Sequence, residues 1–305
     1  YGADEHYPDD TEHQAYLDAP RAVSPSRHMA ISSALNSFAL TLAQDIVENR
    51  CKGKLIYAGG DDVMALVAVD DLLACLSLLR AAYGGLPVPA PLATTLQLDL
   101  EGLQLGGGHA VLDGKLLRLM GERATASAGA VIAHHSAPLG AVLRSLRQAE
   151  KRAKNRGGRD AFAITLLKRG GGATELTLPW RLTDAPTLED SPMQALAALT
   201  RLFAGDDTSR KAAYVTQGWL PHLPSAAQMP REELQALVTR NLAYQIKRQS
   251  AGDLVAEAQA PLLADKLASV AFHPRLGDTS PAETVRDVLA VAEFLACESR
   301  ALKDR

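Results

Sequence analysis

Cysteine is scarce in this sequence of 305 residues. Cys51, Cys75 and Cys297 lie far apart and form no Cys-x-x-Cys pair, which argues against a zinc site and for a reducing compartment. No apolar run reaches the length of a membrane span, and the sequence shows no signal peptide or targeting motif. We therefore expect a cytoplasmic protein that contacts no membrane.

The chain also lacks a strong net charge. Its formal charge is −3 at pH 7, so it carries no overall nucleic-acid signature, and any contact with RNA must be local or shared with partner subunits. Hydrophobic residues make up 47% of the chain, which is ample for buried cores. The length leaves room for two domains.

What stands out instead is the tetrad Gly59-Gly60-Asp61-Asp62, which lies between the apolar runs 54–58 and 63–69. The short runs predict two strands, and the glycines allow the tight reversal of a hairpin. Such a tip does not need two adjacent carboxylates, which repel each other until a hard divalent cation relieves the repulsion. The pattern favours a metal-dependent nucleotide site, and the alternative is an ordinary polar turn, where Gly and Asp are common.

Apolar residues at helical spacing predict a helix on each side of this hairpin. The first covers residues 26–50, with Ser24 as its N-cap, Pro25 in its first position and Ile31 on its apolar face. The second covers residues 70–83. Helix, hairpin and helix are the pieces that follow the first strand in a ferredoxin-like βαββαβ unit.

Three more elements follow in the next hundred residues: a strand at 125–133, a helix at 138–155 and a last strand at 161–167. We expect the helix and last strand to extend the sheet of the ferredoxin-like unit. Between the hairpin and these elements, Gly106-Gly107-Gly108 matches no nucleotide-binding fingerprint and is interpreted as a flexible loop. Gly170-Gly171-Gly172 follows the last strand and is either a domain boundary or a hairpin tip.

Four stretches resemble the palm domain of the large subunit of type III CRISPR effector complexes. They are Ser24-Pro25-Ser26-Arg27-His28 continuing through Phe38, the run from Lys54 to Leu66, the run from Ala128 to His135, and Ala149-Glu150-Lys151-Arg152-Ala153-Lys154 followed by Gly157 to Ala163. Together they cover residues 24–168, and the helix start with His28 favours the III-B subtype. The hairpin resembles, more loosely, that of nucleotide cyclases with a Gly-Gly-Asp-Glu tip.

The resemblance implies an α+β fold, with a ferredoxin-like, nucleotidyl-cyclase-like palm followed by an all-α helical domain. It also implies a nucleotidyltransferase that makes cyclic oligoadenylate from ATP when target RNA is bound. The expected partners are other subunits of the complex, the guide RNA and the target RNA. The expected division of the chain is a loop at 1–23, a palm at 24–182 and a helical domain at 183–305.

Joining ATP units requires an activated 3′-hydroxyl and a stabilised leaving pyrophosphate, which two Mg²⁺ or Mn²⁺ ions can supply. Asp61 and Asp62 are the candidate catalytic residues and metal ligands, and Gly59 and Gly60 leave room for the nucleotide beside the backbone. The resemblance to the cyclases places Lys154 and Arg159 on the triphosphate. For Lys154 the alternative is a solvated helix end favoured by the helix dipole.

One departure from the family concerns its first palm strand, which usually supplies another metal-binding aspartate ahead of the helix at Ser26. Here Asp4, Asp9 and Asp10 lie in a polar stretch that is typical of a loop. We therefore expect this chain to be a fragment of a longer subunit and its metal site to be incomplete.

Histidines supply the remaining polar pair of interest. His134 and His135 end the strand at 125–133 and could contact RNA or a metal, although no Cys or carboxylate stands at ligand spacing from them.

The second half of the chain is expected to be helical. It resembles the C-terminal helical domain of the same subunit family, which implies contacts with small subunits. Three apolar stripes at helical spacing run through residues 196–203, 234–242 and 285–295, and Pro192, Pro230 and Pro281 stand at likely positions for helix starts. Lys247-Arg248 and Arg210-Lys211 could touch RNA phosphates, but a solvated face is the better explanation, because long basic side chains commonly cover surface in this way.

Three hypotheses remain open at this point: a cyclic-oligoadenylate synthase, an inert palm that serves as an assembly and RNA-binding scaffold, and a diguanylate-type cyclase.

Overall fold

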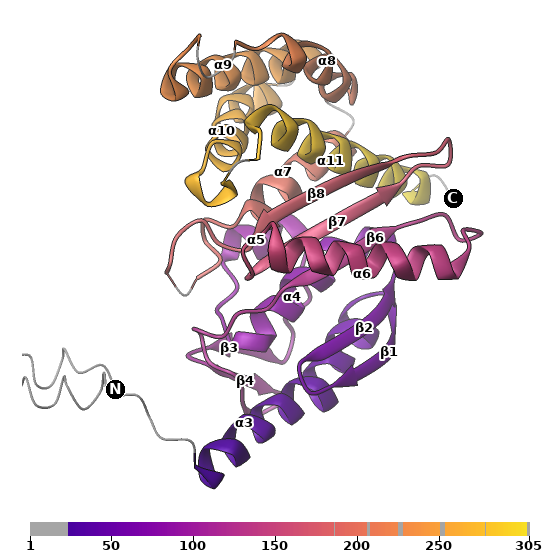
Figure 1. Cartoon of the computed structure of the whole chain (residues 1–305), viewed down its shortest axis with the longest axis vertical. Coiled ribbons are helices and arrows are strands. Elements are labelled where there is room, and N and C mark those ends of the chain that lie inside the picture. The colour runs from indigo at the N-terminus through magenta and orange to yellow at the C-terminus, as the bar shows by residue number, and fades with distance from the viewer. Residues whose placement is uncertain are drawn as a thin grey trace, which may run out of the picture.

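The computed structural model describes residues 24–303, apart from 186, 206–207, 225–227, 251–253 and 278 (Figure 1). The loop expected at residues 1–23, with Asp4, Asp9 and Asp10, lies outside the described residues. Among the described helices, none combines the length and the apolar character that crossing a bilayer requires.

The first helix begins where the sequence predicts. Helix α3 spans Pro25–Ser37, and the side chain of Ser24 accepts a hydrogen bond from the Arg27 backbone N–H at 3.3 Å. The helix then widens into two π-helical segments, η1 (Phe38–Leu42) and η2 (Asp45–Arg50). Phe38 is buried, whereas Ile31 is 39% exposed, because the first turns of α3 extend past the body of the protein (Figure 1). Ile31, which the sequence places on the apolar face of this helix, is therefore not part of the core.

The predicted hairpin forms a sheet of its own. Strands β1 (Gly53–Gly59) and β2 (Asp62–Val67) pair in antiparallel fashion, with a bulge between Leu55 and Tyr57. One face packs on the π-helical segments and helix α4 (Leu72–Gly84) through Leu55, Val63, Ala65 and Val67. The other face presents four apolar side chains: Ile56, Tyr57, Met64 and Leu66.

A small meander that the sequence analysis missed follows α4 and the short helix α5 (Ala90–Leu96). It consists of β3 (Leu103–Gly106), β4 (His109–Leu112) and β5 (Lys115–Arg118), paired in that order. Gly107 and Gly108 have φ values of +58° and +75°, so they form the tight reversal between β3 and β4. The interpretation of this glycine run as a flexible loop was wrong.

The third sheet is covered on both faces. Strand β6 (Ala128–Ile132) is parallel to β7 (Ala161–Leu167), which pairs with the antiparallel β8 (Ala173–Pro179) across the turn that contains Gly170-Gly171-Gly172. Helix α6 (Leu139–Asn155) lies on one face, in front of β6 and β7 in Figure 1. The opposite face packs on α4 and on helices of the second half.

The expectation of one continuous palm sheet was wrong for the described residues. In them, β2 pairs with β1 alone and β6 pairs with β7 alone. The reason is the strand order of a ferredoxin-like unit, in which the first strand lies between the strands that correspond to β2 and β6. Without a described strand in that position, β2 and β6 do not pair with each other. Helix α4 bridges the gap, since Leu73 packs in the core of the β6–β8 sheet and Leu78 in the core of the hairpin.

Helices make up the second half, as predicted. Their bounds are α7 (Pro192–Ala204), α8 (Lys211–Trp219), α9 (Arg231–Gln249), α10 (Leu254–Ala271) and α11 (Pro281–Lys303), with short 3₁₀ turns at Leu220–His222 and Pro274–Leu276. Pro192 and Pro281 are the first residues of their helices and Pro230 is an N-cap, so the three predicted helix starts are confirmed. One apolar cluster joins Trp180 to these helices, and the division at residues 182 and 183 stays a prediction.

Candidate nucleotide and metal site

The hairpin tip is a two-residue turn. Gly59 pairs with Asp62, so Gly60 and Asp61 form the reversal. Of these two residues, Gly60 alone has a positive φ, +61°, as a type II′ turn requires of its first central residue. No heavy atom lies within 4 Å of where a β-carbon of Gly60 would stand, so the space beside the tip is open.

The two carboxylates at this tip are unpaired. Asp61 and Asp62 are both exposed, and neither carboxylate accepts a hydrogen bond from a described residue or forms a salt bridge with one. Adjacent carboxylates that no cation of the protein neutralises are suited to bind one from solution. The structure therefore leaves both predicted ligands free to bind a metal ion.

Tyr83 approaches the tip from the end of α4. Its ring lies edge-on to Phe38, with centroids 5.2 Å apart. Burial raises the pKa of Tyr83, and the negative charge of Asp61 raises it further. The hydroxyl therefore keeps its proton at neutral pH, within electrostatic range of the Asp61 carboxylate.

Lys154 reaches the same end of the molecule from the last turn of α6. Its Nζ donates to Glu150 Oε1 at 2.6 Å, one turn earlier in the helix. This hydrogen bond is the main cause that raises the pKa of Lys154, and the negative charge of Asp62 contributes as well. Because an exposed pair of this kind contributes only about 0.3–0.5 kcal/mol, Lys154 can exchange Glu150 for a phosphate at little cost.

Arg159 lies in a strained turn between α6 and β7. Gly158, Arg159 and Asp160 have φ values of +69°, +66° and +44°, so three successive residues adopt the left-handed region. This region costs a residue with a β-carbon about 1–2 kcal/mol. Gly157, which precedes them, cannot be replaced by a residue with a side chain without a clash, because a β-carbon there would lie 2.6 Å from the Ala153 carbonyl oxygen. The Arg159 side chain is exposed and near enough to Lys154 to lower its pKa slightly.

Asp160 anchors this turn. Its Oδ1 accepts from Arg80 Nε at 2.9 Å, and its Oδ2 accepts from Arg181 Nη2 at 2.6 Å and Nε at 3.0 Å. The Asp160 carbonyl also accepts from the Trp180 backbone N–H at 2.9 Å. The Arg80 side chain is fully buried, and this burial lowers its pKa while the charge of Asp160 opposes the shift. A carboxylate that is only 12% exposed and joins two arginines fixes the backbone on which Arg159 sits.

The residues present fit a divalent cation that keeps several water ligands. Mg²⁺ commonly takes one or two carboxylates together with water and substrate phosphates, and Asp61 and Asp62 offer those two carboxylates. Within the described part of the chain, no group of three or more His, Cys, Asp or Glu side chains could hold a metal ion. A second ion would therefore depend on ligands from phosphate, water or residues outside that part.

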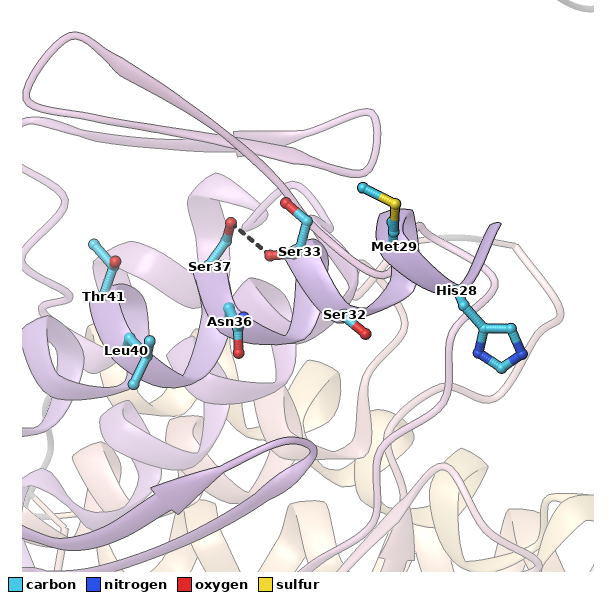
Figure 2. Close-up of a pocket in the computed structure, with 8 residues that line it drawn as sticks. All are labelled: His28, Met29, Ser32, Ser33, Asn36, Ser37, Leu40 and Thr41. Carbon is cyan, nitrogen blue, oxygen red and sulfur yellow. Dashed lines mark hydrogen bonds between the residues drawn. The ribbon is translucent and has the colours of Figure 1, made fainter. Parts of the chain in front are cut away.

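A hollow of about 610 Å³ lies elsewhere, along α3 and η1 (Figure 2). Its lining residues are His28, Met29, Ser32, Ser33, Asn36, Ser37, Leu40 and Thr41. All eight come from one continuous helical segment, and none of them carries a carboxylate. The hollow therefore does not enclose a ligand and does not include any predicted site residue.

Comparison with known proteins identifies the family of the first half. The family described as Cas10/Cmr2, second palm domain, matches residues 11–95 and 110–163. This part of the chain belongs to the Cas10/Cmr2 palm family. The resemblance to the large subunit of type III CRISPR effector complexes is thus confirmed. The matched palm segments include Asp61, Asp62, Lys154 and Arg159.

Two relatives and one solved structure agree with this assignment. The chain is 32% identical over 171 residues to the CRISPR system Cmr subunit Cmr2 of Pyrococcus furiosus, covering 55% of this chain and 16% of the relative. It is 44% identical over 63 residues to the Cmr2 subunit of Saccharolobus solfataricus, covering 21% and 6%. A chain of a type III-B Cmr-beta complex in its apo state shares the fold, with a TM-score of 0.55 and 18% identity over 80% of this chain and 24% of the other. The chain thus spans about a sixth of the first relative's length.

The palm places all four predicted charged side chains, Asp61, Asp62, Lys154 and Arg159, at one end, while their roles stay predictions. Sequence reasoning missed Tyr83, for which no local motif exists. It also missed Asp160, although Asp160 follows Gly157-Gly158-Arg159 directly. The available signal was an aspartate directly after two glycines and an arginine. Its arginine partners could not be inferred, because they are 80 and 21 residues away in sequence.

Proposed function

We propose that this palm joins ATP units into cyclic oligoadenylate, within a type III CRISPR effector complex and in response to target RNA. The observation that carries the proposal is the tip of the hairpin, where the Asp61 and Asp62 carboxylates are exposed and have no partner among the described residues, and where Asp62 is within electrostatic range of Lys154. A pair of bound Mg²⁺ or Mn²⁺ ions would supply activation of the 3′-hydroxyl and stabilisation of the leaving pyrophosphate. Asp61 and Asp62 would hold these ions.

The other residues of the site bind and orient the nucleotide. The open space at Gly60 admits a phosphate or a base, whereas the Tyr57 hydroxyl lies where a β-carbon of Gly59 would stand, so the prediction of room for the nucleotide holds at Gly60 and was wrong at Gly59. Lys154 and Arg159 neutralise the triphosphate, Lys154 by releasing Glu150. Tyr83 retains its proton within electrostatic range of Asp61.

The edges of β2 and β6 that no described strand covers support a further part of the proposal. A strand seated between them would complete the ferredoxin-like sheet next to the tip. The family resemblance implies that this strand carries another metal-binding aspartate. A third carboxylate there would supply the ligand that the described residues lack.

The test uses the assembled complex with guide RNA, target RNA and ATP. Replacing both carboxylates, Asp61→Asn with Asp62→Asn, should reduce the rate of product formation at least about 100-fold, because bound metal lowers the activation free energy by several kcal/mol. The fold should be kept, since the removed charges are exposed and make no ion pair among the described residues. The matched control is Glu189→Gln with Asp190→Asn, an adjacent exposed acidic pair before α7 that should leave the rate unchanged.

Three outcomes would contradict the proposal. Product formation at the normal rate by the Asp61/Asp62 variant would remove both residues from the mechanism. Cyclic diguanylate made from GTP would establish a diguanylate-type cyclase instead. Assembly and RNA binding without any nucleotide product would favour the scaffold, for which the small number of ligands in the described part of the chain is the supporting observation.

A further inference from the structure

Helix α6 has a fixed orientation on its sheet. Its small residues Ala149 and Ala153 are fully buried against Ala161 and Ala163 of β7. A β-carbon at Gly129 of β6 would lie 2.5 Å from the backbone nitrogen of Glu150, so the helix and the strand are in direct backbone contact. The opposite side of α6 consequently faces away from the protein (Figure 1).

That outer side carries a row of cations. Arg144, Arg147, Lys151 and Lys154 follow one another at spacings of three, four and three residues, which places them on one face of the helix. All four are exposed, and the row is about 15 Å long at 1.5 Å per residue. Arg144, Arg147 and Lys151 make no hydrogen bond or ion pair with any described residue, so their charges are not neutralised by the palm.

The local charge contrasts with that of the chain. Between Leu139 and Arg169 there are nine lysines and arginines and two acidic residues, whereas the chain as a whole has a formal charge of −3. One of the two acids is Asp160, whose carboxylate is occupied by Arg80 and Arg181. Such segregation concentrates positive potential on one surface and attracts a polyanion.

Aromatic rings stand at the far end of this row. His134 and His135, in the connection between β6 and α6, lie against each other with ring centroids 4.1 Å apart and ring planes tilted by 39°. Burial lowers the pKa of His134, and the charges of Arg169 and His135 lower it further, which favours the neutral ring. A row of cations that ends at a pair of aromatic rings offers both contacts that single-stranded nucleic acids require. The cations bind the phosphates, and the aromatic faces bind the bases.

We propose that the outer face of α6 binds a single strand of RNA, with phosphates along Arg144, Arg147 and Lys151 and bases against the His134–His135 pair. An acidic peptide would use the cations but not the rings. A duplex keeps its bases stacked on one another and cannot offer them to the histidines. This surface does not rest on the proposed nucleotidyl transfer, because its test needs neither metal nor ATP.

The experiment measures binding of a fluorescent single-stranded RNA of about 20 nucleotides to the full chain by anisotropy, over a salt series from about 50 to about 200 mM. The variant is Arg144→Gln with Arg147→Gln and Lys151→Gln. Its affinity should fall at least tenfold, and the salt dependence should weaken by about 2 in slope, since each neutralised phosphate contributes about 0.7. The charge-matched control is Lys115→Gln with Arg118→Gln and Arg240→Gln, which are exposed and unpaired among the described residues and should change affinity less than twofold.

A second variant tests the rings. His134→Ala with His135→Ala should weaken RNA binding about fivefold while leaving the affinity for inorganic polyphosphate, which has no bases, unchanged. Circular dichroism of each variant verifies the fold. Asp61→Asn with Asp62→Asn should bind RNA as tightly as the unaltered chain, which separates this surface from the nucleotide site.

Four results would overturn the inference. Equal weakening by the α6 variant and its control would show that net charge alone matters, and no weakening in either would show that RNA binds elsewhere or not at all. Duplex RNA bound as tightly as the single strand would contradict the base contacts. Displacement of RNA by polyglutamate at equal charge concentration would assign the surface to an acidic protein partner.

Discussion

The two sheets that carry the candidate site differ in how much of their surface the protein covers. In the β6–β8 sheet, β7 is buried from Ala161 through Leu166, between α6 on one face and helices of both halves on the other. In the β1–β2 sheet, one face is covered and the other leaves Tyr57 and Leu66 55% and 64% exposed. The covered sheet supports Lys154 and Arg159, and the hairpin of the open sheet carries the two adjacent aspartates at its tip.

The difference separates two tasks. Cations that neutralise a triphosphate must be held in place, and the buried sheet with Asp160 provides that rigidity. Metal ligands must stay open to water and substrate, and a hairpin with one uncovered face provides that access. Mutations in the two sheets should therefore act differently, on stability in one and on activity in the other.

The largest effect on stability is expected from Asp160→Ala. This change leaves the guanidinium of Arg80 buried without its partner, which typically costs about 3–5 kcal/mol. It also releases the turn that positions Arg159, so the KM for ATP should rise more than kcat falls. Urea unfolding and steady-state kinetics of the assembled complex measure the two effects.

The matched control for this change is Asp184→Ala. Asp184 also pairs with an arginine, Arg275 at 2.9 Å, but its side chain is 96% exposed. An exposed pair contributes about 0–1 kcal/mol, so the control should be nearly neutral. Equal costs at Asp160 and Asp184 would mean that the Arg80–Asp160–Arg181 cluster does not hold the covered sheet together.

A matched pair of isoleucines compares the sheets directly. Ile164 of β7 is fully buried, and Ile56 of β1 is 51% exposed. Ile164→Ala should cost about 2–5 kcal/mol by opening a cavity, whereas Ile56→Ala should cost about 1 kcal/mol or less, mainly through strand propensity. Denaturant midpoints of the two variants measure this difference. A loss at Ile56 as large as at Ile164 would show that a further element covers the outer face of the hairpin.

The covered sheet was the part that the sequence predicted best. The bounds of β7 agree with the prediction at both ends, because a continuous apolar run lies between Asp160 and the basic turn at Lys168. The hairpin tip was predicted equally well, since turn chemistry is local. The same chemistry was present in the missed meander, where Gly107-Gly108 and Asp113-Gly114 all have positive φ. These two dipeptides therefore mark the two reversals of the meander in the sequence.

What the sequence did not reveal depends on contacts between distant residues. The Arg80–Asp160–Arg181 cluster joins α4, the turn after α6 and the segment after β8, and none of these residues marks the others in sequence. The separation of the palm into two sheets was missed for a similar reason. Periodicity predicts strands, but the edge on which each strand pairs is set by the tertiary structure.

The smallest effect concerns the ionisation of Tyr83, and it tests how the open sheet is placed against α4. Burial and then the charge of Asp61 raise the pKa of Tyr83 above its usual value of 10.0. The tyrosine therefore contributes stability that is fully present below about pH 10 and is lost as the pH rises toward the folded pKa, since the unfolded chain ionises first. Asp61→Asn removes one cause and should lower the pKa of Tyr83, while Asp62→Asn should change it less. The ultraviolet titration of tyrosinate measures this pKa, with Tyr83→Phe subtracted to isolate one tyrosine among seven. The same pKa in all three proteins that keep Tyr83 would mean that the hairpin tip does not lie against α4, and the site would lose the hydroxyl beside Asp61.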